Sequence, residues 1–245
     1  MKNYKLMIAY DGSRYYGWQR QPNQNTIQGK IESVLEVMCG TPVEVIGAGR
    51  TDAGVHAKGM VANANMDAEL TCQEIRDYLN RYLPEDIAVT EVREASPRFH
   101  ARYNAIGKTY RYTCYVGTVK SDFDRKYYTR LEEKPNVGKM RRAAVMLQGE
   151  HDFRNFCVNP RMKKSTVRNV DRIEILEKDD YIYFTFHGNG FLQNMVRIMV
   201  GTLLEVGYGR MSVEQIERVL ENPDREKAGP TAPAQGLCLM EVDYD

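Results

Sequence analysis

One order of secondary-structure elements occurs twice along this 245-residue chain, and that repeat constrains the fold more than any other feature. In the first half, apolar residues at every second position predict strands, and apolar residues at helical spacing predict two helices. The order is strand, helix, strand, strand, helix, strand. The predicted elements lie at residues 4–10, 27–39, 42–46, 58–66, 71–83 and 86–95.

The second half repeats this order and adds one helix. The predicted elements are a strand, a helix, a hairpin that turns at Asp179 and Asp180, a helix, an extra helix and a closing strand. They lie at residues 108–116, 136–149, 166–190, 191–207, 212–221 and 236–244. Each half has the order of a split βαβ unit. We therefore predict an α+β fold in which two tandem ferredoxin-like (βαββαβ) units, residues 1–97 and 98–245, dock side by side with a cleft between them.

Residues at the predicted helix ends agree with this assignment. Thr71 and Glu74 have the spacing of a capping box, in which each side chain bonds to the other residue's main-chain amide. Asn136 is a favoured N-cap, and Gly40 is a favoured residue just past a helix end.

Cysteine usage and hydropathy exclude several protein classes. The five cysteines, at positions 39, 72, 114, 157 and 238, are odd in number and form no CxxC pair. Neither a zinc knuckle nor a disulfide framework is therefore predicted. The opening MKNYKLMIAYDG enters a strand directly, and no apolar run reaches membrane-spanning length. We expect a cytoplasmic protein that does not associate with a membrane.

The net charge of +1 hides a strongly basic central stretch. Between Arg98 and Arg172 there are 18 Lys and Arg against 7 Asp and Glu, whereas the rest of the chain has 16 against 26. A solvated surface would explain the charge alone, but interleaved aromatic residues favour contact with a nucleic acid, whose bases stack and whose phosphates pair with cations. The aromatic residues are Tyr103, Tyr110, Tyr112, Tyr115, Phe123, Tyr127 and Tyr128.

The segment GAGRTDAGVHA, residues 47–57, separates two predicted strands and is longer than a typical hairpin loop. Three interpretations compete. A phosphate cradle fits poorly, because Val55 and His56 replace the Lys-Ser/Thr of a P-loop and strands flank the segment on both sides. An Asx-type turn, in which Asp52 bonds local amides, is the ordinary interpretation. In the third, Asp52 is a catalytic nucleophile or base, held by the glycines and flanked by Arg50.

A single arginine interrupts the apolar helix predicted at 191–207. Apolar residues surround nearly the whole helix, which is typical of a buried helix, and a buried guanidinium needs an anionic partner. Arg197 could pair with Glu205 on the same helix or with another carboxylate. If a cleft lies between the two halves, Asp52 is a candidate partner.

Over essentially its whole length, the chain resembles the tRNA pseudouridine synthase A family. The resemblance rests on segments that occur in the family's order and at its spacing. These are YDGSRYYGWQRQ, GAGRTDAGVHA, FHARYNA, KTYRYTCY, GEHDFRNF, GNGFLQNMVRIMVGTLLEVG and TAPAQGL. The chain departs from the family at Gln193-Asn194, where many members have His or Tyr followed by another polar or aromatic residue.

The resemblance implies an enzyme that isomerises a tRNA uridine to pseudouridine. The N1–C1′ glycosidic bond breaks, the uracil rotates, and C5 joins C1′. No cofactor and no metal are implied, and four scattered His and five scattered Cys make no ligand set. The implied targets are positions 38, 39 and 40 of the anticodon stem-loop, modified by a homodimer whose two subunits share each tRNA.

The resemblance also implies residue roles. Asp52 matches the nucleophilic aspartate, which attacks the nucleoside at C1′ or C6. Tyr110 matches the active-site tyrosine, whose ring stacks on the uracil and whose hydroxyl is placed for C5 deprotonation; from the residues alone, Tyr110 could instead face the core. Arg197 matches the basic residue that pairs with the aspartate, and Arg50 matches the arginine that acts on the RNA or on base extrusion.

Two other residues are predicted to be structural. His56 is expected to fix its loop by a hydrogen bond, and Trp18, the only tryptophan, is expected to pack in the core rather than stack on RNA. A uridine in a helical stem must be flipped out before reaction, which costs a few kcal/mol of stacking.

Three rival hypotheses remain. A non-catalytic RNA-binding protein built from two ferredoxin-like units would use its sheet faces, but KTYRYTCYV lacks the aromatic pattern of an RNP-type strand. An enzyme acting on small nucleosides would leave the basic stretch without a purpose. A paralogue that modifies another tRNA position or another RNA keeps the chemistry, and the Gln193-Asn194 departure keeps this rival open.

Overall fold

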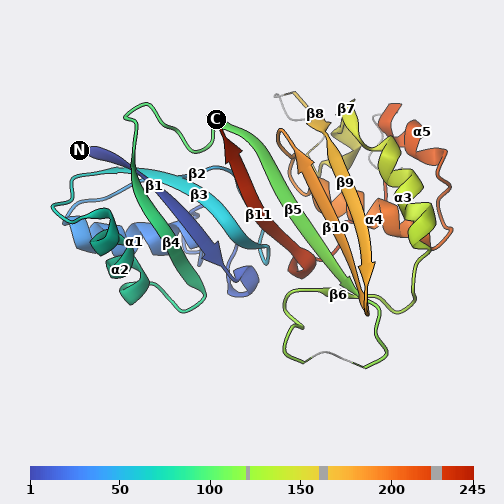
Figure 1. Cartoon of the computed structure of the whole chain (residues 1–245), viewed down its shortest axis with the longest axis horizontal. Coiled ribbons are helices and arrows are strands. Elements are labelled where there is room, and N and C mark those ends of the chain that lie inside the picture. The colour runs from blue at the N-terminus through green and yellow to red at the C-terminus, as the bar shows by residue number, and fades with distance from the viewer. Residues whose placement is uncertain (120–121, 160–164, 222–227) are drawn as a thin grey trace. The chain divides into compact units, whose positions relative to one another are not determined.

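A computed structural model describes residues 1–119, 122–159, 165–221 and 228–245 of the chain (Figure 1). The chain forms two compact units. Unit 1 comprises residues 1–106 and 238–245, and unit 2 comprises residues 107–237. The predicted division at 97/98 therefore falls before the boundary between these units, and most of the closing strand groups with unit 1.

Unit 1 has the predicted order of strands and helices. Its elements are β1 (Lys2–Tyr10), α1 (Ile27–Cys39), β2 (Val45–Gly47), β3 (His56–Met66), α2 (Cys72–Tyr82) and β4 (Ile87–Ala95). Strand β1 lies between β4 and β3 and is antiparallel to both, and β2 pairs with the other edge of β3. This is the strand order of a ferredoxin-like unit. The closing strand β11 (Leu237–Tyr244) pairs in parallel with the first residues of β3.

The Thr71–Glu74 capping box and Gly40 act as predicted in unit 1. The Thr71 and Glu74 side chains bond to each other's main-chain amides and form a capping box at the start of α2. The Thr26 hydroxyl accepts from the Gly29 amide at the start of α1, and Gly40 ends that helix in the left-handed region with φ 67°. The apolar faces of α1 and α2 are buried, with Ile31 and Leu35 fully enclosed on α1.

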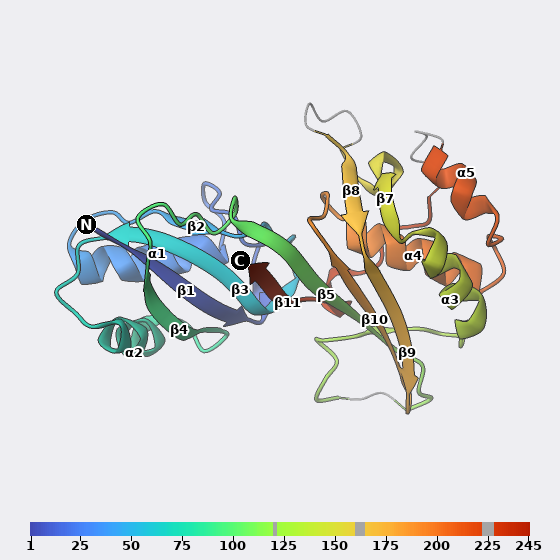
Figure 2. The same cartoon turned by 45° about the horizontal axis from the view of Figure 1, so that its top comes forward.

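Unit 2 contains a three-stranded antiparallel sheet in the order β5-β10-β9, and α3 and α4 lie on one side of it (Figure 2). Asp179 and Asp180 form the predicted hairpin turn between β9 and β10, with Asp179 at φ 53°. The main elements are β5 (Ala105–Tyr115), α3 (Val137–Met146), β9 (Arg172–Lys178), β10 (Tyr181–Gly188) and α4 (Met195–Gly207).

Unit 2 also has features that the sequence did not predict. The segment before β9 forms a separate strand, β8 (Val167–Val170), which pairs with β7 (Gly149–Asp152). A two-residue strand, β6 (Thr129–Arg130), lies beside β5. The extra helix α5 (Gln215–Glu221) begins later than the predicted residue 212.

The predicted start of the apolar helix at Phe191 is wrong. Helix α4 begins at Met195, because Asn194 has φ 60° and a left-handed residue cannot continue a right-handed helix. Among the described residues, no helix is long and apolar enough to cross a membrane.

Candidate active site

Asp52 lies in the loop formed by residues 48–55, which joins β2 to β3. The loop is shorter than the predicted segment 47–57, because Gly47 ends one strand and His56 begins the next. The Val55 amide donates to the Asp52 main-chain carbonyl at 3.1 Å, which closes a four-residue turn. Gly54, at the third position, has φ 79°, and a turn with positive φ there favours glycine. The side chain of Asp52 is half-buried.

The segment of residues 10–18, YDGSRYYGW, lies against this loop and holds its backbone. The hydroxyls of Tyr10 and Thr51 share a buried hydrogen bond of 2.8 Å. The Trp18 amide donates to the Thr51 carbonyl at 3.1 Å, and the Gly54 amide donates to the Tyr15 carbonyl at 3.3 Å. The residues on both sides of the Asp52-Ala53 pair are therefore fixed to one neighbouring segment, which we call the bracing segment.

Two glycines let the bracing segment approach so closely. A Cβ atom at Gly17 would lie 2.4 Å from the Thr51 carbonyl oxygen, and one at Gly12 would lie 2.0 Å from the Val55 carbonyl oxygen. Gly17 also has φ 88°, a conformation that residues with a side chain rarely adopt. Main chain therefore packs directly on main chain, with no side chain between the two segments.

His56 and Trp18 have the structural roles predicted for them. The His56 ring is buried, and its Nδ1 accepts from the Gly12 amide at 3.1 Å. Asp11 Oδ1 lies 3.2 Å from the same nitrogen, but an Nδ1 that accepts from an amide has no proton to donate, so we assign the hydrogen bond to Gly12. Trp18 is 2% exposed, and a Cβ at Gly47 would meet its ring at 2.5 Å.

Arg50 comes from the same loop as Asp52, and its side chain is exposed. Its Nε donates to Gln19 Oε1 at 3.0 Å. Gln19 in turn donates to Gln28 Oε1 on α1, and Gln28 is buried. A cation at the edge of the loop is thus tied through amide side chains to the first helix.

Tyr110 lies in the middle of β5 in unit 2. It is 7% exposed and lies on the strand's buried side together with Tyr112 and Cys114. Its ring meets the edge of the Phe191 ring at a centroid distance of 5.2 Å and an angle of 83°. This burial agrees with the core-facing interpretation, and the catalytic role of Tyr110 stays a prediction.

Arg197 lies in the first turn of α4, and it is half-buried rather than fully buried. Its Nε donates to the Ala232 carbonyl at 2.7 Å, and one terminal nitrogen donates to Asn194 Oδ1 at 2.8 Å. Both of these partners are uncharged, so these two bonds orient the guanidinium without neutralising it. The alternative partner Glu205 instead forms an ion pair with Arg210 at 3.1 Å.

The predicted site residues divide between the two units. Asp52 and Arg50 share the loop of unit 1, whereas Tyr110 and Arg197 belong to unit 2. Sequence reasoning missed the role of Asn194, which both ends the turn before α4 and accepts from Arg197. In the sequence, Asn194 stands out only as part of the departure from the family at Gln193-Asn194.

The basic stretch between residues 98 and 172 is open to solvent, but its aromatic residues are only partly so. Every described lysine and arginine in it is exposed except Lys108 and Arg168, which are half-buried, and four of its cations lie outside the described residues. Tyr103, Phe123 and Tyr127 are exposed. The other four aromatic residues are enclosed within the protein. The enclosed ones are Tyr110, Tyr112, Tyr115 and Tyr128.

The five cysteines, all within the described residues, are free thiols in the structure. Burial raises the pKa of the Cys114 thiol. Within the described part of the chain, no three His, Cys, Asp or Glu residues are grouped as a metal site would require.

Comparison with known proteins gives one family. The model of a family described as tRNA pseudouridine synthase matches residues 6–104 and 143–245. The chain is 49% identical to tRNA pseudouridine synthase A of Bacillus sp. strain KSM-64, and the match covers 100% of both chains. It is 47% identical to tRNA pseudouridine synthase A 2 of Bacillus anthracis, again over 100% of both. It is 44% identical to tRNA pseudouridine synthase A of Geobacter sp. strain M21, over 100% of this chain and 99% of that one.

Among solved structures, the archaeal box H/ACA sRNP Nop10-Cbf5 complex matches with 13% sequence identity and a TM-score of 0.38. The match covers 82% of this chain and 43% of that one, and so low a score supports no conclusion.

Replacing Gly17 with alanine tests whether the bracing segment holds the loop. The added Cβ would strain a positive φ and would also press on the Thr51 carbonyl. We expect Gly17→Ala to slow uridine conversion by roughly 10- to 100-fold, because small misplacements of a reacting group have effects of that size. Single-turnover assays with tRNA would measure this.

Gly40→Ala is the matched control. Gly40 has φ 67°, but no other atom lies within 4 Å of the position its Cβ would take. It should lose roughly 1–2 kcal/mol of stability from backbone strain and keep its conversion rate. Equal conversion rates in the two variants would contradict the bracing role of the segment.

Proposed function

Because the chain belongs to the tRNA pseudouridine synthase family, we propose that it isomerises uridine at positions 38, 39 and 40 of the tRNA anticodon stem-loop. Pseudouridine synthesis in tRNA is the activity of the family. The choice of positions 38, 39 and 40 is our proposal. One structural observation supports the proposed activity most directly. Asp52 lies on a loop whose backbone is held on both sides by residues 10–18. A nucleophile needs that kind of fixed direction.

Asp52 is the proposed nucleophile. A carboxylate can attack the nucleoside at C1′ or at C6 and form a covalent intermediate, which divides one difficult step into two. The N1–C1′ bond breaks, the uracil rotates and C5 bonds to C1′. The covalent bond to Asp52 breaks again and restores the carboxylate, C5 loses its proton, and N1 gains one. Atoms and charge balance without any external reactant, as an isomerisation requires.

Tyr110 is the proposed partner of the uracil ring. Its position in the middle of β5, with the Phe191 ring edge-on at 5.2 Å, supports a fixed orientation of its own ring. The phenol would remove the C5 proton after rotation, since a positioned side chain can transfer a proton within hydrogen-bond reach. Arg50, exposed beside Asp52, would contact the RNA or assist extrusion of the uridine.

We propose that Arg197 pairs with Asp52 and keeps it ionised. A nearby guanidinium favours the charged form of a carboxylate. The bonds from Arg197 to the Ala232 carbonyl and to Asn194 support this, because they fix the direction of the guanidinium.

The exposed cations between residues 98 and 172 would bind tRNA phosphates. Such contacts provide most of the affinity for nucleic acids and help to offset the cost of flipping a base. We also propose that the enzyme works in the cytoplasm as a homodimer; both proposals rest on the family resemblance.

The assignment of positions is tested by pseudouridine mapping of total RNA from a strain that lacks this gene. Loss of pseudouridine at positions 38, 39 and 40, restored by the wild-type gene, is the expected result. Loss at another tRNA position or in another RNA would favour a paralogue with a different target. An unchanged map would favour the non-catalytic RNA-binding protein or an enzyme acting on small nucleosides.

Asp52→Asn should abolish conversion and leave tRNA binding intact, because the amide keeps the shape of the side chain and loses its nucleophilic charge. The measurements are tritium release from tRNA labelled at uridine C5 and a filter-binding assay. Asp67→Asn, the same change at an exposed site after β3, is the control and should be fully active. Residual activity of Asp52→Asn within tenfold of wild type would sink the nucleophile assignment.

Tyr110→Phe should slow the chemical step while tRNA affinity stays close to that of wild type, since the ring remains and the hydroxyl is lost. Proton transfer by a positioned side chain typically contributes about 10²- to 10⁴-fold in rate. Tyr112→Phe removes a neighbouring hydroxyl that bonds to Thr129 and to the Pro233 carbonyl, so it should reduce stability and keep the rate. Equal rates for Tyr110→Phe and wild type would remove the hydroxyl from the mechanism.

Arg197→Lys should be poorly active, because an ammonium cannot present the planar fork of a guanidinium to a carboxylate. The pairing itself is tested by unfolding measurements on Asp52→Asn, Arg197→Met and the double variant. Contacting residues give non-additive free energies of unfolding. Additivity within about 0.5 kcal/mol would show that the two side chains do not touch. Arg210→Met, which removes the ion pair with Glu205 and the contact with the Tyr208 ring, both away from Arg197, serves as the control.

A further inference from the structure

We propose that Asp86 is a positioning residue for this reaction, because its carboxylate anchors the bracing segment behind the Asp52 loop. The proposal rests on the proposed role of Asp52, and nothing in the family match assigns it. Asp86 is in unit 1, directly before β4, and does not itself belong to the loop.

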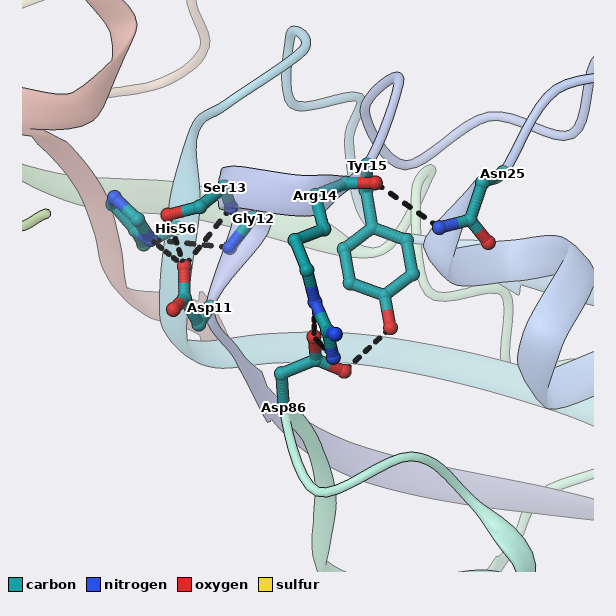
Figure 3. A network of polar contacts seen from close by, with 8 residues as sticks. All are labelled: Asp11, Gly12, Ser13, Arg14, Tyr15, Asn25, His56 and Asp86. Atoms are coloured by element: carbon teal, nitrogen blue, oxygen red, sulfur yellow. Dashed lines mark hydrogen bonds and ion pairs between the residues drawn. The ribbon is translucent and has the colours of Figure 1, made fainter.

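Asp86 contacts the bracing segment at three points, and Figure 3 draws the two that its side chain makes, with Arg14 and with Tyr15. Its Oδ1 accepts from the Tyr15 hydroxyl at 2.5 Å, and its Oδ2 accepts from Arg14 Nε at 2.9 Å and from an Arg14 terminal nitrogen at 2.5 Å. Its main-chain carbonyl accepts from the Asp11 amide at 2.9 Å. One residue thus holds the segment by main chain and side chain together.

Tyr15 connects Asp86 to the Asp52 loop. Tyr15 bonds to Asp86 through its hydroxyl and to the loop through its carbonyl, which accepts from the Gly54 amide at 3.3 Å. Gly54 lies two residues after Asp52, in the turn that the Asp52 carbonyl closes. A shift of Tyr15 would therefore move the turn that begins at Asp52.

The Tyr15 contact outweighs the Arg14 contact. The Arg14 side chain is 70% exposed, and exposed ion pairs contribute about 0–1 kcal/mol. Tyr15 is 5% exposed, and the Asp86 side chain is 12% exposed, so their bond is largely shielded from water. Burial, followed by the bond to Asp86, raises the pKa of Tyr15, so the phenol remains a hydrogen-bond donor at neutral pH.

A second set of bonds joins the same segment to the histidine after the loop. The Gly12 amide donates to His56 Nδ1 at 3.1 Å, and Asp11 Oδ1 accepts from both the amide and the hydroxyl of Ser13 (Figure 3). These contacts stiffen the turn between Asp11 and Tyr15. The stretch between Asp86's contacts and the loop is short and held by its own hydrogen bonds. A displacement of Asp86 would therefore displace the loop as well.

The test compares Asp86→Asn and Tyr15→Phe with Glu94→Gln. Glu94, on β4, forms an exposed ion pair with Lys2 at 2.5 Å, so Glu94→Gln also removes a carboxylate from the same unit but does not touch the bracing segment. We expect the single-turnover rate at saturating tRNA to fall roughly 10- to 100-fold in Asp86→Asn and Tyr15→Phe, and to stay within twofold of wild type in Glu94→Gln. The dissociation constant for tRNA should not change in any of them.

The only tryptophan provides a readout independent of catalysis. Trp18 is enclosed, and its amide bonds to the Thr51 carbonyl. Acrylamide should quench its fluorescence more readily in Asp86→Asn and Tyr15→Phe than in Glu94→Gln. The double variant Asp86→Asn, Tyr15→Phe should be no slower than the slower single variant, because Asn weakens the same bond that Phe removes.

Three results would overturn the proposal. The first is a single-turnover rate within twofold of wild type in both variants. The second is an additive rate loss in the double variant. The third is a larger dissociation constant for tRNA with an unchanged chemical rate, which would indicate that Arg14 and Tyr15 contact the RNA. Asp52→Asn is assayed in parallel: if it stays active, the proposed function itself fails, whatever Asp86 does.

Discussion

The hydrogen bonds that hold Thr51 are the constraint on which the rest of the site depends. The Tyr10 hydroxyl bonds to the Thr51 side chain, and the Trp18 amide bonds to its carbonyl. Because Thr51 directly precedes Asp52, these two bonds fix where the turn begins. The Gly54 amide donates to the Tyr15 carbonyl and so fixes the second half of the turn. A surface loop is usually the most mobile part of a domain, and this one is tied on both sides of its central aspartate.

The same bracing segment also completes the first helix. The first N–H groups of a helix lack partners within the helix. Here the amides of Ile27 and Gln28 donate to the carbonyls of Gly17 and Trp18 at 3.2 and 3.0 Å. One stretch of chain therefore caps α1 and supports the loop. This dual role explains its buried aromatic side chains, Tyr10, Tyr15 and Trp18, and its glycines, which permit close approach. Anchoring it at Asp86 ties the loop to the start of β4 as well.

The sequence predicted the features that are local. Asn136, the Thr71–Glu74 box, Gly40 and the turn at Asp179-Asp180 could all be predicted, because capping and turn formation depend on a few adjacent residues. The Asp52 loop was recognised, but not its support: the Tyr10–Thr51 bond joins residues far apart in sequence, and only pairing of β1 with β3 brings them together. The burial of four aromatic residues in the basic stretch could not be predicted from the sequence for a similar reason. Tyr112 and Tyr128 alternate with basic residues in the sequence, yet strand geometry and the Tyr115 ring enclose them. The start of α4 at Met195 could not be predicted, because it is set by the left-handed conformation of one residue, Asn194. The Asn194 side chain accepts a hydrogen bond from Arg197.

The central claim is that the loop carrying Asp52 is already fixed before tRNA binds, and amide hydrogen exchange on the protein without RNA tests it most directly. The amides of Trp18 and Gly54 bond to the Thr51 and Tyr15 carbonyls, so they report on the two supports of the loop. We expect both amides to exchange as slowly as those in the centre of β1 and β3, with opening free energies near that of global unfolding. Fast exchange of these two amides, while the β1 and β3 amides stay protected, would show that the loop opens on its own and would contradict the account.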